Sequence, residues 1–369
     1  MYKMMTPGPT MVAENVRKAR STETGNPDLD PDFYDFYKET CVLYSELLHT
    51  NNESLILSGE GILGLEAAVA SLTERGNRVL VLDNGVFGKG FADFVSLYGG
   101  EPVLYTTDYK REIDVEALRI FLEKDSDFKY ATVVHCDTPS GMLNNIGAIC
   151  PLLKEYGILT VVDSVSGMFG NAVDVDAFQI DILCGGSQKA ISCPVGLTLV
   201  TISEDAKQAM MNRKTKIASF YANLLTFQNY YETKWFPYTM PISDIYGLRQ
   251  ALENIKADPD FLKRHEEIAA RTRAALERAG LHLYAENGYS NIVTVFSIPG
   301  GVTAAEILRV MQEEHNIMLA GSFDVMAGEV IRIGHMGYNC TEKNMQETLQ
   351  ALDCTLRKLG VELSATLEF

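Results

Sequence analysis

Long apolar runs that do not alternate with polar residues constrain this chain more than any other feature. Three of them are apolar almost throughout: Val79–Leu82, Ala131–Val134 and Leu159–Val162. Strands that are buried on both faces have this composition, and they occur in mostly parallel sheets covered by helices. Segments of helical length separate the runs, so the sequence predicts an α/β fold with a mostly parallel, doubly wound sheet.

The same alternation extends over residues 54–202. We expect strands at residues 54–58, 78–82, 102–106, 130–136, 158–163, 180–184 and 196–202, and helices at 62–74, 88–99, 114–124 and 147–156. A polar loop at 21–35 and a helix to about residue 48 precede them. The Pro-rich start, Thr6-Pro7-Gly8-Pro9-Thr10, excludes helix and central strand and predicts a stiff arm.

The pattern changes in the last third of the chain. Two helices are predicted at 243–256 and 259–279, followed by a strand at 291–297, a helix at 303–315, a strand at 330–333 and a helix at 342–359. A chain of 369 residues is long for one core. We therefore predict an N-terminal arm (1–20), a large domain (21–245) and a smaller α+β C-terminal domain (246–369).

Composition narrows the classes of partner. The net charge of −17 argues against nucleic acid and against anionic membrane surfaces, because both attract basic patches. The seven cysteines form no CxxC pair, which favours reduced thiols in a cytoplasmic protein over a zinc site or a disulfide framework. No apolar run approaches the roughly 18 residues of a membrane span, and no signal-peptide core is present.

One glycine-rich stretch has two interpretations. Gly59-Glu60-Gly61-Ile62-Leu63-Gly64 is a literal GxGxxG between a predicted strand and a predicted helix, and Asp83 ends the next strand. This is the pattern of a dinucleotide fingerprint, so an NAD-dependent oxidoreductase is one alternative. Glycines before a helix N-terminus bind any phosphate, however, because the free N–H groups and the helix dipole attract anions. The phosphate of another cofactor is therefore the favoured interpretation, and a plain tight turn is the third.

Lys189 is the candidate nucleophile. It follows the apolar run 180–184 in the stretch Gly185-Gly186-Ser187-Gln188-Lys189. A lysine held at a strand end beside glycines, a hydroxyl and an amide can act as an amine nucleophile. Our hypothesis is a Schiff base between Lys189 and pyridoxal 5′-phosphate (PLP).

Asp163 supplies the electronic reason for that cofactor. It ends the apolar run 159–162, and a carboxylate in that position must be paired or solvated. PLP needs an anion beside its pyridine nitrogen. Two unit charges 4 Å apart are worth about 4 kcal/mol at an effective dielectric of 20, or roughly three pKa units of support for a protonated ring.

Other strand ends point to the same place. Phe87 lies between glycines after a strand and could stack on a flat ring or pack in the core. The segment 137–141 follows another strand, and its side chains could reach a ring hydroxyl. Arg332 lies in the apolar strand 330–333, where it would pair with a substrate carboxylate or with an internal acid.

Together these motifs resemble the class V aminotransferases of PLP fold type I, most closely the alanine–glyoxylate and serine–pyruvate aminotransferase group. The resemblance runs over nearly the whole chain. Its markers are TPGPT at 6–10, SGEGILGLEAAV at 58–69, DNGVFG at 83–88, DTPSGMLN at 137–144, VVDSVSGMFG at 161–170, GGSQKA at 185–190 and RIGHMG at 332–337.

The resemblance implies a role for each candidate residue. Lys189 would be the Schiff-base lysine and Asp163 the partner of the ring nitrogen, with Phe87 stacked on the ring and Thr138 near its hydroxyl. It further implies a homodimer with shared active sites. The remaining assignments concern the phosphate seat (Glu60, Gly61, Ile62, Gln188 and, from the neighbouring subunit, Thr239) and the substrate (Gly8 and Arg332, which would bind the α-carboxylate).

The chain also departs from the family pattern. Glu60 stands where relatives usually carry a small residue or a hydroxyl, and a carboxylate beside a phosphate is unfavourable unless it turns away or meets a cation. Ile62 replaces a frequent polar or aromatic residue, and Phe236 replaces a frequent tyrosine. The loop at 21–35 lacks the usual histidine.

The sequence thus predicts a PLP-dependent aminotransferase that moves an amino group from a small amino acid, of the alanine or serine type, to a 2-oxo acid such as glyoxylate or pyruvate. The same residues would serve a ureidoglycine or 2-aminoethylphosphonate transaminase. A PLP lyase and a non-catalytic PLP-binding protein are further alternatives. No metal is expected.

Overall fold

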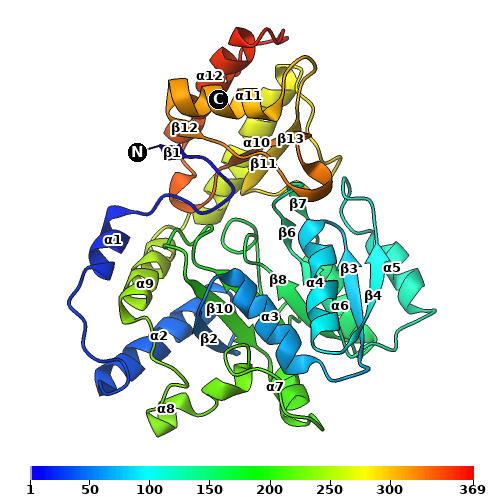
Figure 1. The fold of residues 1–369 in the computed structure, drawn as a ribbon, viewed down its shortest axis with the longest axis vertical. Helices are drawn as coiled ribbons and strands as arrows, with labels where there is room; N and C mark the ends of the chain where they lie inside the picture. The colour runs from blue at the N-terminus through cyan, green and yellow to red at the C-terminus, as the bar shows by residue number, and fades with distance from the viewer. Residues whose placement is uncertain (1) are drawn as a thin grey trace.

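A mostly parallel sheet fills the larger lobe of the protein (Figure 1). The computed structural model describes residues 2–369. Within these residues the sheet has seven strands in the order β2-β10-β9-β8-β5-β3-β4, and only β10 runs against the others. Their bounds are β2 (Glu53–Ser58), β3 (Arg78–Asp83), β4 (Glu101–Thr106), β5 (Tyr130–Val134), β8 (Leu159–Asp163), β9 (Ile182–Gly186) and β10 (Leu197–Ile202).

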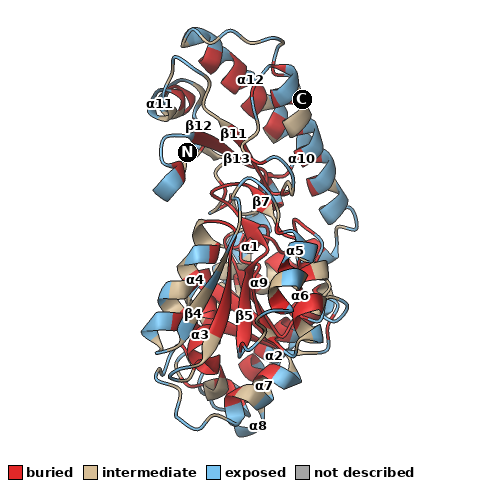
Figure 2. Ribbon diagram, turned by 90° about the vertical axis from the view of Figure 1, so that its right-hand side faces the viewer, coloured by how far each residue is buried: buried red, intermediate tan, exposed pale blue. Residues whose placement is uncertain are grey.

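Helices cover both faces of this sheet (Figure 2). Helices α3 and α4 lie on one face, and α2, α5 and α6 lie on the other. The predicted doubly wound sheet is confirmed, and most predicted strands match the observed ones to within two residues. The helices of this lobe are α2 (Pro31–Leu47), α3 (Gly61–Leu72), α4 (Val86–Leu97), α5 (Val115–Leu122), α6 (Ile146–Glu155), α7 (Glu204–Met211), α8 (Tyr230–Thr233) and α9 (Ile242–Lys256), with the 3-10 turn η1 (Leu224–Phe227).

Sequence and burial explain these elements. Strands β5 and β10 are buried at every position, and β8 at all but its first. Side-chain caps fix helix starts, because free backbone N–H groups there need acceptors. Asp114 accepts two such N–H groups at the start of α5, and Asn145 accepts one at the start of α6.

The smaller lobe contains a second core. Its main strand pair, β11 with β13, is antiparallel, and a bridge between Ala320 and Arg332 continues it toward β12. Apolar residues from its helices close this core. Its elements are α10 (Phe261–Arg278), β11 (Val293–Ser297), α11 (Ala304–His315), β12 (Ile317–Met318), η2 (Asp324–Met326), β13 (Val330–Gly334), η3 (Gly337–Asn339) and α12 (Glu342–Lys358).

The N-terminal arm is more structured than the sequence suggests. Strand β1 (Lys3–Met4) pairs in parallel with β12, and helix α1 (Glu14–Arg20) packs against α9. Both pairings join segments that are far apart in the sequence. The predicted division at 245/246 falls inside α9, which packs with the large lobe, and the three-part division of the chain stays a prediction.

The carboxyl ends of the parallel strands face the small lobe. After β5, a tight hairpin of β6 (Cys136–Asp137) and β7 (Met142–Leu143) brings Gly141 against Val295 of β11. The Ser322 hydroxyl donates to the Pro139 carbonyl at 3.4 Å. Ligands of α/β sheets bind at this edge, so the fold places the candidate site between the lobes.

Candidate active site

Lys189 lies just beyond the end of β9. Its Nζ donates a hydrogen bond to the Pro7 carbonyl of the arm at 2.8 Å. The pKa of Lys189 is lowered from its ordinary value, chiefly by burial. The Glu60 and Asp163 carboxylates act to raise this pKa, and the charge of Arg332 acts to lower it further. A lowered pKa makes the neutral amine accessible, as an amine nucleophile requires.

Asp163 ends β8 and is 7% exposed. One carboxylate oxygen accepts from the Val165 N–H at 2.9 Å. Burial raises the pKa of Asp163 to about 7, although that N–H and Lys189 both act to lower it. A carboxyl group poised near neutral pH is suited to share a proton with a ring nitrogen.

Glycines draw the start of α3 to the segment that follows Asp163. A Cβ on Gly61 would lie 2.8 Å from Val165 Cγ2, and one on Gly186 would lie 2.9 Å from Val165 Cγ1. Real Cβ atoms do not approach neighbours so closely, so both positions need glycine. The predicted phosphate seat and the predicted ring partner therefore lie next to each other.

Glu60 fills the predicted phosphate seat with its own carboxylate. It is the N-cap of α3, and its Oε2 accepts from the Ile62 N–H at 2.9 Å. Its Oε1 accepts from the Gln188 amide. Within residues 2–369 it forms no ion pair with a lysine, arginine or histidine. Glu60 thus neither turns away from the seat nor forms such a pair.

Phe87 lies in the first turn of α4 and is half-buried. Its N–H donates to Asp137 at 3.1 Å, and that buried carboxylate also accepts from the Ser140 hydroxyl at 2.7 Å. The Phe87 ring meets Phe323 edge-on, with centroids 6.0 Å apart. A fixed backbone and a partly open ring are compatible with stacking on a flat cofactor.

Arg332 lies in β13 and is 9% exposed. Its Nε donates to the Gly321 carbonyl at 2.5 Å, and its Nη1 is 3.5 Å from the Thr138 carbonyl. Among the described residues no carboxylate lies within ion-pair distance of this guanidinium, so the alternative of an internal salt bridge is wrong. Burial lowers the pKa of Arg332 to about 10, which leaves it protonated at neutral pH. An unpaired buried arginine is suited to bind a carboxylate as a fork.

The arm closes one side of the site. Gly8 has a φ of +96°, and a Cβ there would lie 2.4 Å from Lys189 Cδ and 2.7 Å from its Nζ. The Thr10 N–H donates to the Gln188 carbonyl at 3.0 Å, which ties the arm to the lysine segment. Gly8 therefore borders the amine, as its assignment to the substrate side requires.

Thr239 stands apart from this cluster. It is exposed, and its hydroxyl donates to Asp28 in the loop 21–35 at 2.8 Å. Within the described chain no hydrogen bond joins it to Gln188 or Lys189. Phe236 beside it is buried and stacks on Tyr34, with ring centroids 4.6 Å apart. The role of Thr239 in a neighbouring subunit stays a prediction.

The fold also recruits groups that sequence reasoning missed. The Pro7 carbonyl holds the Lys189 amine, and the Phe323 ring lies 5.6 Å from the Arg332 guanidinium and against Phe87. Phe323 belongs to the loop between β12 and β13, and a single aromatic residue in a loop carries no signal of its own. The antiparallel pairing of β13 with β11 is what places that loop over the site.

The dinucleotide alternative fails on topology. Within residues 2–369, β2 pairs with β10 alone, in antiparallel fashion, at the edge of the sheet. Four strands separate β2 from β3, so Asp83 cannot reach a ribose held at Gly59–Gly64. Asp83 instead accepts hydrogen bonds from Thr106 at 2.9 Å and Tyr109 at 2.6 Å.

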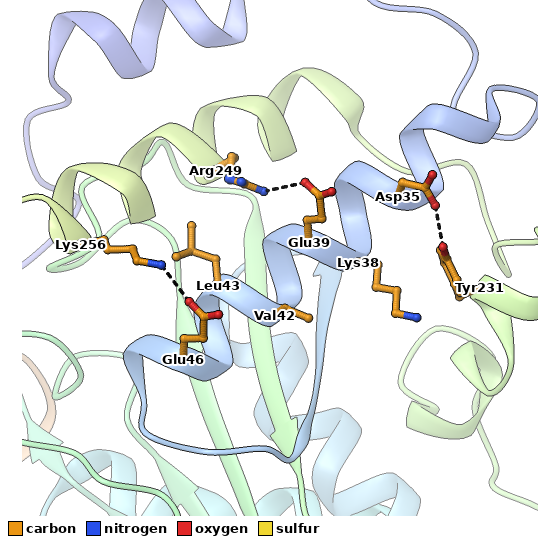
Figure 3. Close-up of a pocket in the computed structure, with 9 residues that line it drawn as sticks. All are labelled: Asp35, Lys38, Glu39, Val42, Leu43, Glu46, Tyr231, Arg249 and Lys256. Carbon is orange, nitrogen blue, oxygen red and sulfur yellow. Dashed lines mark hydrogen bonds and ion pairs between the residues drawn. The ribbon is translucent and has the colours of Figure 1, made fainter.

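A separate surface groove lies along α2 (Figure 3). Its carboxylates are already engaged: Glu46 pairs with Lys256 at 2.9 Å, and Asp35 accepts from Tyr231 at 2.7 Å. It shares no residue with the surroundings of Lys189. Saturated surface pairs of this kind stabilise weakly and carry no catalytic chemistry.

A lysine and a buried carboxyl group at the edge of the large sheet lie beside an unpaired arginine from the small lobe, and these are the groups of an enzyme that handles amines and carboxylates. The family model for class V aminotransferases matches residues 12–345, and the chain belongs to this family. It is an aminotransferase of fold type I, as the sequence predicts.

Several relatives are named as aminotransferases or transaminases, and they match this chain over most of their lengths. An uncharacterized aminotransferase of Methanocaldococcus jannaschii is 35% identical, covering 98% of this chain and 94% of the relative. The pyridoxamine–pyruvate transaminase of Mesorhizobium japonicum is 30% identical, covering 91% and 87%. The crystal structure of ureidoglycine–glyoxylate aminotransferase from Bacillus subtilis superposes with a TM-score of 0.95 at 28% identity, covering 100% and 96%. Alanine–glyoxylate aminotransferases are also among the relatives.

Proposed function

We propose that this aminotransferase uses pyridoxal 5′-phosphate and moves an amino group from a small amino acid to a 2-oxo acid through Lys189. One observation carries the proposal: an amine with a lowered pKa and a buried carboxyl group at the edge of the large sheet lie close to an unpaired arginine of β13 in the small lobe. Each of these groups is costly to bury and contributes little to folding, so a ligand that uses all three accounts for them.

The residues present fit the ring of the cofactor. Asp163 would hold the ring nitrogen, Phe87 would cover one ring face, and Lys189 would stand at the reacting carbon. The seat for the phosphate, in contrast, contains the Glu60 carboxylate. When bound, the cofactor supplies a carbonyl that condenses with amines and a protonated ring that accepts electrons from the substrate carbon.

The chain's own residues supply positioning and proton transfer. Arg332 binds the substrate carboxylate and so orients the α-carbon. The Lys189 Nζ would remove the proton from that carbon as a general base and would deliver it to the reacting carbon of the cofactor as a general acid. The Pro7 carbonyl accepts a hydrogen bond from this amine and limits where it can move. As a carboxylate, Asp163 would pair with the ring nitrogen and keep the proton on that nitrogen, so that the ring stays electron-poor.

Substrate choice follows from the relatives and from Arg332. Alanine and glyoxylate appear in the names of several relatives, which supports small donors such as alanine or serine and acceptors such as glyoxylate or pyruvate. Ureidoglycine as donor is an alternative, since that transaminase is a close structural neighbour. A 2-aminoethylphosphonate donor has no carboxylate to pair with Arg332, which disfavours it.

We further propose a homodimer with shared sites, in the cytoplasm. The exposed rings of Phe220, Tyr221 and Trp235, which are 57%, 52% and 56% exposed, support a covered surface near Thr239. All seven cysteines have free thiols, which supports a reducing compartment. None of the helices within residues 2–369 has the length and apolar character to cross a membrane.

A donor screen tests the proposed function. Purified protein supplied with PLP or, in a parallel set, with pyridoxal is offered alanine, serine, glycine, glutamate, ureidoglycine and 2-aminoethylphosphonate against glyoxylate and pyruvate, and the new amino acid is measured. We expect the fastest turnover with alanine or serine. Turnover that is confined to donors without a carboxylate would remove the assignment of Arg332. Complete absence of amino transfer from every donor would refute the proposed function.

A further inference from the structure

The N-terminus of α3 already holds an anion, and that anion is part of the chain. The Glu60 carboxylate accepts from the Ile62 N–H at 2.9 Å and from the Gln188 amide. These are the donors that a 5′-phosphate of the cofactor would need, because a phosphate at a helix N-terminus binds through such N–H groups. Phosphate binding therefore requires Glu60 to leave its hydrogen bonds and to accept a second anion beside it.

Among the described residues no ion pair offsets this repulsion. No lysine, arginine or histidine within residues 2–369 forms an ion pair with Glu60. Lys189 is close enough for Glu60 to raise its pKa, but the ring chemistry occupies that amine. A phosphate carries up to two negative charges, so its approach to a carboxylate in a half-buried site is opposed strongly.

A second observation points to a different 5′-substituent. Gln188 is 4% exposed, its amide nitrogen reaches Glu60, and its Oε1 has no hydrogen-bond partner among the described residues. The seat thus presents acceptors: the two Glu60 oxygens and the free Gln188 Oε1. A phosphate dianion has no hydrogen to donate to them, whereas a hydroxyl group donates one.

We propose that Glu60 selects the form of vitamin B6 that enters this site. The carboxylate favours a ring that carries the 5′-hydroxymethyl group, as in pyridoxal or pyridoxamine, over one that carries a 5′-phosphate. The hydroxyl of that group donates to Glu60 or to Gln188 Oε1. The inference rests on the ring chemistry of the proposed function, since Lys189 and Asp163 act on the ring in either case, and it replaces the 5′-phosphate form named there with pyridoxal or pyridoxamine.

Binding of the two vitamers tests the inference directly. Cofactor-free protein is titrated with pyridoxal and with pyridoxal 5′-phosphate, and the visible absorbance of the lysine-bound ring gives each Kd. We expect the wild-type protein to bind pyridoxal more tightly. Glu60→Gln keeps the shape and removes the charge, and we expect it to shift the ratio of the two Kd values at least tenfold toward the phosphate. Glu60→Ser should shift the ratio in the same direction.

Glu66→Gln is the matched control. Glu66 lies on the same helix and accepts from the Tyr98 hydroxyl at 2.6 Å, so its loss changes the charge of α3 without touching the seat. We expect the control to leave the ratio within twofold. Circular dichroism and a melting curve show whether Glu60→Gln folds. If it does not fold, the ratio of the two Kd values is measured in Glu60→Ser instead.

Two results overturn the inference: tighter binding of pyridoxal 5′-phosphate by the wild-type protein, or a ratio that Glu60→Gln and Glu60→Ser change by less than tenfold. In both cases the ring still bonds to Lys189, so the proposed function survives. If neither vitamer attaches covalently to Lys189 in any folded variant, the proposed function is wrong. The inference, which rests on that function, is then wrong as well.

Discussion

The two ends of the site around Lys189 treat their polar groups in opposite ways. At the ring end, Lys189, Asp163 and Arg332 have no ion-pair partner among residues 2–369, and burial shifts the pKa of each away from its ordinary value. At the α3 end, the Glu60 carboxylate already accepts hydrogen bonds from the Ile62 N–H and from the Gln188 amide. Unpaired buried groups await a ligand, whereas a closed hydrogen-bond set must first be opened. On our proposals, the ring end carries the chemistry of the family, and the α3 end recognises a different 5′-substituent.

The largest expected effect is at the ring end. Lys189→Ala removes the amine that moves the substrate proton, and we expect turnover to fall by about 10³-fold or more. Steady-state assays with the best donor measure this loss. Lys89→Ala, an exposed lysine on α4, is the control and should stay within twofold of the wild type. Near-normal turnover without Lys189 would break the ring-end account.

Asp163→Asn should lower turnover by about 10²-fold, because the ring loses its anion. The same substitution should raise the free energy of unfolding of the cofactor-free protein at alkaline pH. The pKa of Asp163 is about 7 in the folded protein against an ordinary value of 3.8, so the folded state binds the proton more tightly. Its contribution to the free energy of unfolding is therefore greatest below about pH 4 and falls as the pH rises through 7.

We accordingly expect Asp163→Asn to stabilise the cofactor-free protein at pH 8, by up to about 4 kcal/mol for a difference of about three pKa units, and to have little effect at pH 4. Urea unfolding at several pH values measures this. Asp125→Asn is the control with the opposite sign, because Arg78 holds the pKa of that carboxyl below its ordinary value. If Asp163→Asn lowered the free energy of unfolding at pH 8, this would contradict a buried environment that raises the pKa of Asp163.

Arg332→Ala tests the carboxylate fork. Loss of a charge-assisted pair costs about 1.5–3 kcal/mol, so KM for the 2-oxo acid should rise about 10- to 100-fold. The affinity for the cofactor ring should change little. Arg332→Lys keeps the charge without the fork, and an intermediate KM is expected. An unchanged KM in Arg332→Ala would remove Arg332 from the substrate site.

Phe87→Ala should give the smallest effect of the series. An aromatic stacking contact is worth about 0.5–1.5 kcal/mol beyond burial, so ring affinity should fall by about tenfold at most. Titration with pyridoxal measures it, and Phe87→Tyr should bind as the wild type does. If Phe87→Ala weakened the binding of pyridoxal 5′-phosphate but not of pyridoxal, Phe87 would act at the α3 end. The two ends of the site would then not be separate in function.

Lys189 and Asp163 at the ring end could be predicted from the sequence because Asp163 ends a strand and Lys189 follows one closely. Parallel strands end at one edge, so the positions of Lys189 and Asp163 follow from the apolar runs before them. The α3 end could be predicted only in part. Glu60 stands out as unusual, but its bond to Gln188 depends on β2 and β9 lying on either side of β10. The pairing of β1 with β12 and the placement of Phe323 likewise depend on tertiary structure that no local pattern encodes.

Reductive trapping tests the central claim most directly. The protein is incubated separately with pyridoxal and pyridoxal 5′-phosphate, reduced with borohydride, digested and analysed by mass spectrometry. We predict a reduced ring on the peptide that contains Lys189, with greater occupancy from pyridoxal at limiting concentration. A ring attached to a different lysine, or none at all in a protein that transaminates normally, would contradict the account.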